Sequence, residues 1–188
     1  MMTTSDLSID MEIVRQWLEQ GRPVTLLDVR PAEERAEWAI PGSIHVDAYQ
    51  ALKAGDPQAL AAVTLPSDAP VVTICGAGKV SLIAAEQLQE RGVPARSLLG
   101  GMQAWSLAWN TADVSVPGSV AQVIQVRRTG KGCLSYLIGA DDAATVIDPA
   151  LPPDVYRDLA QRHGWRITQV LETHLHADHL SRARALAE

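Results

Sequence analysis

The first 110 residues alternate short apolar segments with segments of helical periodicity, and this order constrains the fold more than any other feature. Strands are predicted at the short apolar runs, which are residues 24–30, 40–46, 71–75 and 95–101. Helices are predicted by apolar spacing, acidic starts and glycine stops at residues 8–20, 31–39, 81–92 and 102–110. Strands that alternate with helices lie parallel in one sheet. The sequence therefore predicts an α/β fold, a parallel sheet with helices on both faces.

The pattern changes at a segment of small and polar residues that contains the breakers Pro117 and Gly118. Three β-type runs follow, and then a helix and a further strand, at residues 120–128, 132–139, 143–149, 152–164 and 166–173. We therefore expect a first domain at residues 1–112, a linker at 113–119 and the start of a second domain at 120–188.

Composition and charge exclude several classes of function. The formal net charge is −6, so the chain lacks the basic surface that nucleic acids require. No apolar run approaches the roughly 18 residues that span a bilayer, and residues 1–10 are too polar for a secretory signal. Two cysteines are too few for a disulfide framework, which favours a cytoplasmic protein. We expect no nucleic-acid or membrane partner, and the oligomeric state stays open.

One of the two cysteines stands where a nucleophile could work. Cys75 ends an apolar strand, and a helix is predicted to start near Ser81. The residues between them are mostly small: Gly76, Ala77, Gly78, Lys79 and Val80. Small residues let backbone N–H groups turn inward to bind an anion, and the helix N-terminus adds its positive end. Such a loop stabilises a thiolate, which is the attacking form of cysteine.

Two other interpretations of this loop compete. A cysteine at a strand end is often buried and inert, and the loop alone does not decide against that. A phosphate-binding P-loop needs four residues between its first glycine and the Gly-Lys pair, whereas one residue separates Gly76 from Gly78. The spacing excludes the P-loop.

The remaining polar candidates in the first 140 residues are better explained as structural residues. Asp28, Arg30 and Glu34 lie at a strand end and a helix start, where charges usually pair or cap. His45 is expected to be a partly buried, hydrogen-bonded histidine on a strand. Cys133 lies within a β-type run and is expected to pack.

A family resemblance decides between the interpretations of the cysteine loop. Residues 26–46, 71–92 and 98–105 together resemble the rhodanese family, in a match that runs from about residue 8 to residue 110. The matching features are the Asp-Val-Arg sequence, the acidic helix, the Ile-Pro-Gly turn, the cysteine loop and the Gly-Gly-x-x-x-Trp ending. The six-residue loop that begins at Cys75 is similar to that of the sulfur-handling members.

The resemblance implies sulfane-sulfur transfer, with Cys75 as nucleophile and the loop from Gly76 to Ser81 as the substrate-binding cradle. The thiolate would take a sulfur atom from thiosulfate or a persulfide and pass it, through a cysteine persulfide, to a thiol or to cyanide. No cofactor is implied for this domain. The loop lacks the arginine of some members, so a glutathione-type or protein persulfide is as good a candidate donor as thiosulfate.

A cluster of histidines follows the last predicted strand, with three of the five histidines within six residues. The candidate metal ligands are His174, His176, Asp178 and His179. On an extended loop the two alternate histidines face one point, and the next two ligands face another as a helix begins. Neutral imidazole and carboxylate are ligands that Zn²⁺ and Fe²⁺ accept. The sequence therefore predicts metal-binding ancestry at this loop.

The His-x-His-x-Asp-His pattern resembles the metallo-β-lactamase superfamily, and the β-type runs before it match that family's opening strands. Residues 172–179 look most like the persulfide dioxygenase and glyoxalase II branch. The resemblance implies Fe²⁺ or Zn²⁺ in a complete domain, with Asp148 as a core or supporting aspartate behind the metal loop. It also covers only the opening part of an αββα fold, whose later ligands lie far downstream. We therefore expect a fragment of a longer protein, which would not bind the metal tightly.

Three functions follow from these resemblances, in order of preference. The first is a sulfurtransferase that serves persulfide oxidation in the intact protein. The second is a metal-dependent hydrolase or persulfide dioxygenase of the metallo-β-lactamase type, with the rhodanese part as accessory; iron would favour the dioxygenase and zinc the hydrolase. The third is a non-catalytic rhodanese-like module that binds a partner protein. The intact Cys75 in an uninterrupted glycine loop favours catalysis.

Overall fold

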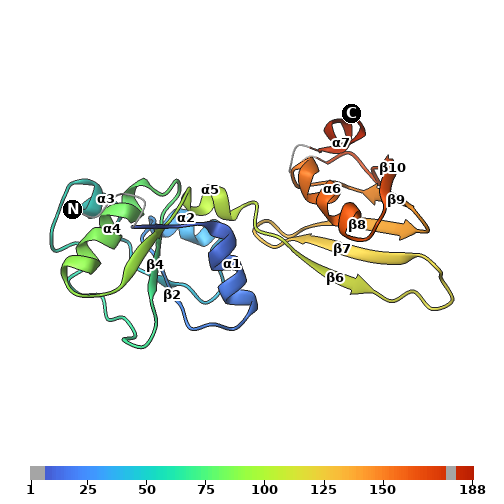
Figure 1. Ribbon diagram of the computed structural model, residues 1–188. Helices are drawn as coiled ribbons and strands as arrows, with labels where there is room; N and C mark the ends of the chain where they lie inside the picture. Colours follow the sequence, from blue (N-terminus) through green and yellow to red (C-terminus); the bar gives the residue numbers. More distant parts are fainter. Residues whose placement is uncertain (1–6, 177–180) are drawn as a thin grey trace. The chain divides into compact units, whose positions relative to one another are not determined.

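The computed structural model describes residues 7–176 and 181–188. The chain forms two compact units, Met1–Ala108 and Trp109–Glu188 (Figure 1). Each unit has its own sheet and its own hydrophobic core. Within the described ranges, no helix combines the length and the apolar character needed to cross a membrane.

A five-stranded sheet with parallel pairings forms the centre of the first unit. Its strands are β1 (Ser8–Ile9), β2 (Thr25–Asp28), β3 (Ile44–His45), β4 (Val71–Ile74) and β5 (Ala95–Leu98). The strand order is β1-β5-β4-β2-β3, which places β4 in the middle. Every residue of β2 and β4 is buried, because these inner strands are covered on both faces.

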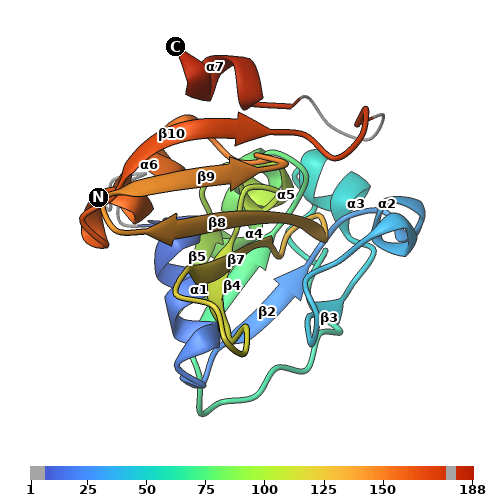
Figure 2. The ribbon, with the colours of Figure 1, turned by 90° about the vertical axis from the view of Figure 1, so that its right-hand side faces the viewer.

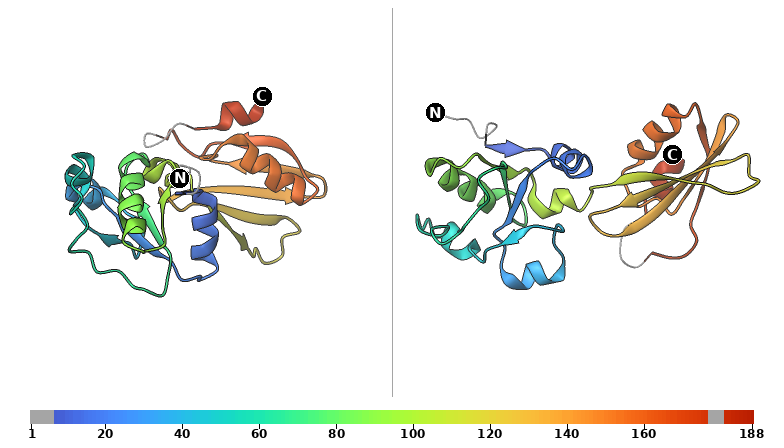
Figure 3. Two further views of the ribbon diagram at one scale, coloured as in Figure 1. Left: turned by 60° about the vertical axis from the view of Figure 1, so that its left-hand side comes forward. Right: turned by 90° about the horizontal axis from the view of Figure 1, so that it is seen from below.

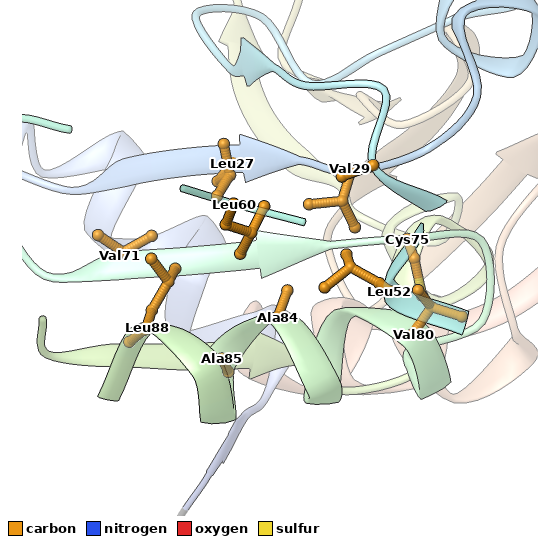
Figure 4. Close-up of a cluster of buried hydrophobic side chains, with 12 residues drawn as sticks. Leu27, Val29, Leu52, Leu60, Val71, Cys75, Val80, Ala84, Ala85 and Leu88 are labelled. Carbon is orange, nitrogen blue, oxygen red and sulfur yellow. The ribbon is translucent and has the colours of Figure 1, made fainter. Parts of the chain in front are cut away.

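Helices cover both faces of this sheet, which confirms the predicted fold class. They are α1 (Met11–Glu19), α2 (Ala32–Glu37), α3 (Tyr49–Lys53), α4 (Lys79–Glu90) and α5 (Gly101–Trp105). On one face, side chains of α3 and α4 pack against Leu27 and Val71 of β2 and β4 (Figure 4). On the other face, α1 and α5 enclose a second cluster around Leu26, Ile74 and Trp105.

Two helix starts in the first unit differ from the sequence prediction by more than one residue. The helix α4 begins at Lys79, two residues before Ser81, because Gly78 adopts a left-handed conformation (φ +85°) that turns the chain into the helix. The helix α1 begins at Met11, because Asp10 caps it by accepting a hydrogen bond from the N–H of Glu12 at 2.8 Å.

In the residues that the structure describes, the second unit contains a mixed five-stranded sheet and two helices. The course of the chain through this unit can be followed in Figures 2 and 3. Its elements are β6 (Asn110–Val114), β7 (Gln122–Arg128), β8 (Cys133–Ala140), β9 (Ala143–Ile147), α6 (Pro153–Arg162), β10 (Arg166–Leu171) and α7 (Ala183–Ala187). The strands β6 to β9 pair antiparallel in chain order, and β10 joins β9 in parallel. Tyr156 of α6 and Leu186 of α7 bury one face of this sheet around Leu137 and Val146.

The boundary between the units falls between Ala108 and Trp109, before the predicted linker at 113–119. The reason is that β6, at Asn110–Val114, pairs along its whole length with β7 and so belongs to the second sheet. The breakers Pro117 and Gly118 therefore lie in the connection between two strands of one sheet.

Candidate functional sites

Cys75 lies at the carboxyl end of β4, where the chain leaves the sheet toward α4. Its side chain is buried, with 2% of its surface exposed, and it packs beside Val80 and Leu52 (Figure 4). In parallel α/β folds, ligands bind outside the carboxyl ends of the strands. The strand end that carries Cys75 is therefore the expected place for a reacting group.

Hydrogen-bond donors surround the sulfur of Cys75. The N–H of Gly78 donates to Sγ at 3.1 Å and the hydroxyl of Ser81 donates to it at 3.2 Å. Other backbone N–H groups of the loop donate no hydrogen bond within the described residues; they belong to Gly76, Ala77, Lys79 and Val80. These donors lie at the N-terminus of the 12-residue helix α4, whose dipole favours negative charge. The loop is built to hold an anionic sulfur and an anion beside it.

The cysteine loop is locked against the segment that follows β5. The N–H of Met102 donates to the carbonyl of Cys75 at 2.8 Å, and the N–H of Gln103 donates to the carbonyl of Gly76 at 3.0 Å. Gly101, the first residue of α5, has a left-handed φ of +55°, and a Cβ there would overlap the carbonyl oxygen of Cys75. The glycine pair of the Gly-Gly-x-x-x-Trp ending therefore lets two backbone segments approach closely.

Two exposed charges of opposite sign accompany the loop. Lys79 is the first residue of α4, and its side chain is exposed. The carboxylate of Glu34, from α2, lies 3.8 Å from the place that a Cβ on Gly76 would take. Neither side chain forms an ion pair in the part of the chain that is described. Both charges are thus available to an approaching substrate.

Asp28 and Arg30 have a structural geometry instead. They form an ion pair of 2.7 Å in which both side chains are almost fully buried. Arg30 also donates to the carbonyl of Trp38 at 2.9 Å, and a ring nitrogen of His45 lies 2.8 Å from the carbonyl oxygen of Arg30. These bonds connect β2 to the segment after α2 and to β3. Asp28 and Arg30 are therefore assigned a structural role and no role at the sulfur of Cys75.

The second candidate site follows β9 and β10, whose carboxyl ends are adjacent because the two strands are parallel. One ligand atom each from Asp148, His174 and His176 lies within 4.8 Å of the other two. Asp178 and His179, the other two predicted ligands, lie outside the described residues.

Thr173 organises this cluster. Its backbone N–H donates to Oδ1 of Asp148 at 2.7 Å, and its hydroxyl donates to Oδ2 at 2.6 Å. The hydroxyl oxygen also lies 2.8 Å from Nδ1 of His174. Because the single hydroxyl hydrogen goes to Asp148, Nδ1 of His174 carries a hydrogen and donates it to Thr173. Nε2 of His174 is then the nitrogen with a lone pair for a metal ion.

Asp148 is held as a carboxylate in this cluster. Burial raises the pKa of Asp148, but hydrogen bonds from Thr173 and His176 outweigh that effect and leave the pKa below its ordinary value. Its Oδ1 also lies 3.2 Å from Nε2 of His176. Two oxygens already engaged by Thr173 and His176 fit an orienting role behind the histidines better than a direct metal bond. The donor set of imidazole and carboxylate fits Zn²⁺ or Fe²⁺.

Sequence reasoning missed one polar residue of the cysteine site. Ser97 of β5 is 1% exposed, and its hydroxyl lies 2.8 Å from that of Ser81. The signal was a serine on the same face of a buried strand as Ala95, where an apolar residue is usual. Its partner could not be read from the sequence, because that partner depends on how β5 and α4 pack.

Two family models match the chain. The model described as "Rhodanese-like domain" matches residues 10–108, and the model described as "Metallo-beta-lactamase superfamily" matches residues 128–188. Both resemblances inferred from the motifs are thereby confirmed. The second match begins at Arg128, the last residue of β7, so residues 109–127 lie outside both matches.

Curated relatives divide in the same way. The chain is 33% identical over 98 residues to the putative sulfurtransferase YtwF of Bacillus subtilis (strain 168), which covers 52% of the chain and 87% of that protein. It is 36% identical over 77 residues to a tRNA sulfurtransferase of Desulfurococcus amylolyticus, which covers 41% of the chain and 14% of that protein. It is 43% identical over 61 residues to a hydroxyacylglutathione hydrolase of Anaeromyxobacter dehalogenans, which covers 32% of the chain and 24% of that protein. The chain thus spans most of the first relative and under a quarter of the other two.

Proposed function

The chain belongs to the rhodanese-like domain family through residues 10–108, and on this premise we propose that it is a sulfurtransferase in which Cys75 carries the sulfur. One observation supports this most strongly. The sulfur of Cys75 accepts hydrogen bonds from Gly78 and Ser81, inside a loop with further backbone donors that have no acceptor in the described structure. Such a loop stabilises a thiolate before the reaction and an anionic persulfide after it.

The proposed reaction has two steps. The Cys75 thiolate attacks the outer sulfur of thiosulfate or of a persulfide; the new S–S bond forms as the old one breaks, and sulfite or a thiolate leaves with the electron pair. An acceptor thiolate or cyanide then attacks the outer sulfur of the Cys75 persulfide, and the Cys75 thiolate leaves. No outside oxidant or reductant is needed. The unused N–H groups of the loop hold the terminal sulfur between the two steps.

The two opposite charges beside the cysteine loop favour small sulfur donors that carry both positive and negative groups. Lys79 attracts an anionic donor, whereas the carboxylate of Glu34 near Gly76 opposes a compact dianion such as thiosulfate. A glutathione-type persulfide carries both ammonium and carboxylate groups and can meet both charges. We therefore propose small persulfides as donors alongside thiosulfate, and a thiol as the usual acceptor.

Intact mass measurement tests this function directly. The purified chain is incubated with thiosulfate, and separately with glutathione persulfide, and is then treated with cyanide. We expect the gain of one sulfur atom, its removal by cyanide, and no gain in Cys75→Ala. Cys133→Ala is the matched control and should take up sulfur as the unaltered chain does, because Cys133 lies on β8 in the other unit. No gain of sulfur from either donor would contradict the proposal.

The cluster after β10 favours a second, metal-dependent function. We propose that His174 and His176 would hold Fe²⁺ or Zn²⁺, with Asp178 and His179 as further ligands and Asp148 as the orienting carboxylate. A bound Zn²⁺ would supply Lewis acidity for a hydrolase, and a bound Fe²⁺ would supply the redox chemistry that a persulfide dioxygenase requires. The residues of this chain would fix the histidine ring through Thr173 and keep the carboxylate ionised.

Metal titration tests this second function. We expect Asp148→Asn to weaken the binding of Zn²⁺ by about tenfold to a hundredfold, which is the usual effect of losing an orienting partner. Asp142→Asn is the control, since Asp142 is an exposed aspartate that pairs with Arg166 at the other end of β9 and β10. Equal losses in the two variants, or no metal binding by the unaltered chain, would contradict the metal site.

A further inference from the structure

We propose that Ser97 is a positioning residue for sulfur transfer, because its hydroxyl directs the hydroxyl of Ser81 onto the sulfur of Cys75. The inference rests on the proposed function and adds a residue to its site. All three side chains are buried, with 2% of Cys75, none of Ser81 and 1% of Ser97 exposed. They come from three different segments: the end of β4, the first turn of α4 and the middle of β5.

The hydroxyl groups form a closed chain of hydrogen bonds with the cysteine loop. Oγ of Ser81 lies 3.2 Å from Sγ of Cys75 and 2.8 Å from Oγ of Ser97. Oγ of Ser97 lies 3.3 Å from the carbonyl oxygen of Gly78. The N–H of the same Gly78 donates to Sγ at 3.1 Å, which closes the chain.

The number of hydrogens fixes the direction of this chain when Cys75 is a thiolate. Each serine hydroxyl has a single hydrogen to donate. Ser81 gives its hydrogen to the sulfur, so the hydrogen bond between the serines must be donated by Ser97. A hydroxyl that accepts a hydrogen bond is a stronger donor itself, because the bonds of a chain polarise one another. Ser97 therefore strengthens the bond that Ser81 makes to the thiolate.

The chain can reverse when Cys75 is a neutral thiol. The thiol then donates to Ser81, Ser81 donates to Ser97, and Ser97 donates to the carbonyl of Gly78 at 3.3 Å. Every hydroxyl keeps a partner in both directions, so neither state leaves a buried donor unsatisfied. The longer bond to Gly78 makes the thiol direction the weaker one. The two serines thus favour the thiolate without any charged side chain.

This bias acts on both steps of sulfur transfer. In the first step it orients a hydrogen bond onto the attacking thiolate of Cys75. In the second step Cys75 is the leaving group, and a stabilised thiolate leaves faster. The loop has no arginine, so a chain of buried hydroxyls supplies part of the stabilisation that a cation would give.

Thr73 provides a matched control within the same structure. It pairs with Ser97 across β4 and β5 and is fully buried. Its hydroxyl donates at 2.7 Å to the backbone carbonyl of Ser81, so it supports the same turn of α4 without joining the chain to the sulfur. A change at Thr73 therefore reports on packing and on the support of the α4 turn, whereas a change at Ser97 also reports on the chain to the sulfur.

The test measures the alkylation of Cys75 by iodoacetamide as a function of pH, by peptide mass, in the full chain with Cys133→Ala as background. In Ser97→Ala we expect the pH of half-maximal alkylation rate to rise by about half a unit to one unit. We also expect persulfide transfer to an acceptor thiol at neutral pH to slow by about threefold to tenfold. Ser97→Thr, which keeps a hydroxyl, should restore both readouts, and Thr73→Val should leave the pH profile in place.

Each outcome of the alkylation test bears on the role of Ser97 or on the proposed function. An unchanged pH profile in Ser97→Ala would overturn the proposal, and so would an equal shift in Thr73→Val. If Ser97→Ala does not fold, Ser97→Cys keeps the size of the side chain with a weaker donor, and it should give a smaller shift in the same direction. If no variant takes up sulfur but the alkylation profile of Ser97→Ala still shifts, the proposed function fails and the positioning role of Ser97 stands.

Discussion

The two candidate sites of this chain stabilise charge in opposite ways. Around Cys75, the stabilising groups are backbone N–H groups and buried hydroxyls, and no charged group of the described residues forms a hydrogen bond with the sulfur. Around His174 and His176, the stabilising group is the ionised carboxylate of Asp148. The cysteine lies within a closed core, whereas His174 is exposed. In the proposed functions, the first site needs only the fold of its own unit, while the second would need a metal ion as well.

This difference predicts which kind of substitution would disrupt each site. A site made of backbone donors depends on how closely two backbone segments approach, so an added methyl group can destroy it. A site made of side chains depends on the hydrogen bonds that orient them, so a lost hydroxyl or amide partner weakens it in steps.

The largest effect is expected from Gly101→Ala. A Cβ at this position overlaps the carbonyl oxygen of Cys75 and crowds the N–H of Gly78, and the residue has a left-handed φ of +55°. We expect a loss of sulfur uptake of more than about a hundredfold and a loss of about 2–4 kcal/mol in unfolding free energy. The initial rate of persulfide formation and denaturant unfolding measure the two losses.

Gly92→Ala is the matched control for that prediction. Gly92 also has a left-handed φ, +80°, but nothing lies within 4 Å of a Cβ placed there. We expect the variant to lose only about 1 kcal/mol, the cost of the strained conformation, and to transfer sulfur normally. Equal losses of activity in the two variants would show that backbone strain, and not the close approach at Cys75, controls the site.

A smaller effect, confined to the second unit, is expected from Tyr156→Phe. The phenol oxygen accepts hydrogen bonds from the N–H groups of Ala150 and Leu151, at 2.9 and 3.2 Å, and lies 2.8 Å from Oγ of Ser135. Ser135 donates in turn to the carbonyl of Asp148 at 2.7 Å. Removal of the phenol takes away the acceptor of the Leu151 N–H and leaves the N–H of Ala150 with only a long bond of 3.4 Å to Oγ of Ser135, so it should cost about 1–3 kcal/mol. Hydrogen exchange resolved along the chain should show faster opening in residues 109–188 and no change in the first unit.

The same tyrosine gives the second unit a pH dependence. Burial raises the pKa of Tyr156 above its ordinary value near 10. The folded state therefore keeps a proton that the unfolded chain releases, so stability is complete below about pH 10 and falls as the pH rises toward the folded pKa. We expect this alkaline loss in the second unit of the unaltered chain and a shallower loss in Tyr156→Phe. An equally steep loss in both proteins would assign the pH dependence to another group.

The parts of this molecule that could be predicted from sequence are those encoded by local pattern. Apolar runs and helical spacing predict the parallel sheet, and the strand–glycine–helix order places Cys75 at the edge where ligands bind. The role of β6 was missed because Asn110–Val114 has a linker-like composition and acquires its structure from pairing with β7. Ser97 was missed for a related reason, since its meaning depends on a contact between β5 and α4 that local pattern does not encode. Both features depend on contacts between residues that are far apart in the sequence, and local sequence patterns do not predict such contacts.

The smallest effect is expected at the carboxylate of Glu34, which lies beside the cysteine loop. Glu34→Gln removes the carboxylate beside Gly76 and should raise kcat/KM for thiosulfate by about twofold to threefold at low ionic strength, because an exposed charge acts through a screened field. The gain should fade in high salt and should be absent with a zwitterionic persulfide donor. Glu37→Gln, on the same helix, removes an equal charge and should leave the donor preference unchanged. A gain of tenfold or more that persists in high salt would mean that Glu34 contacts the donor directly. A carboxylate would then act at the cysteine site as well as at the histidine site, and the two sites would not differ in this respect.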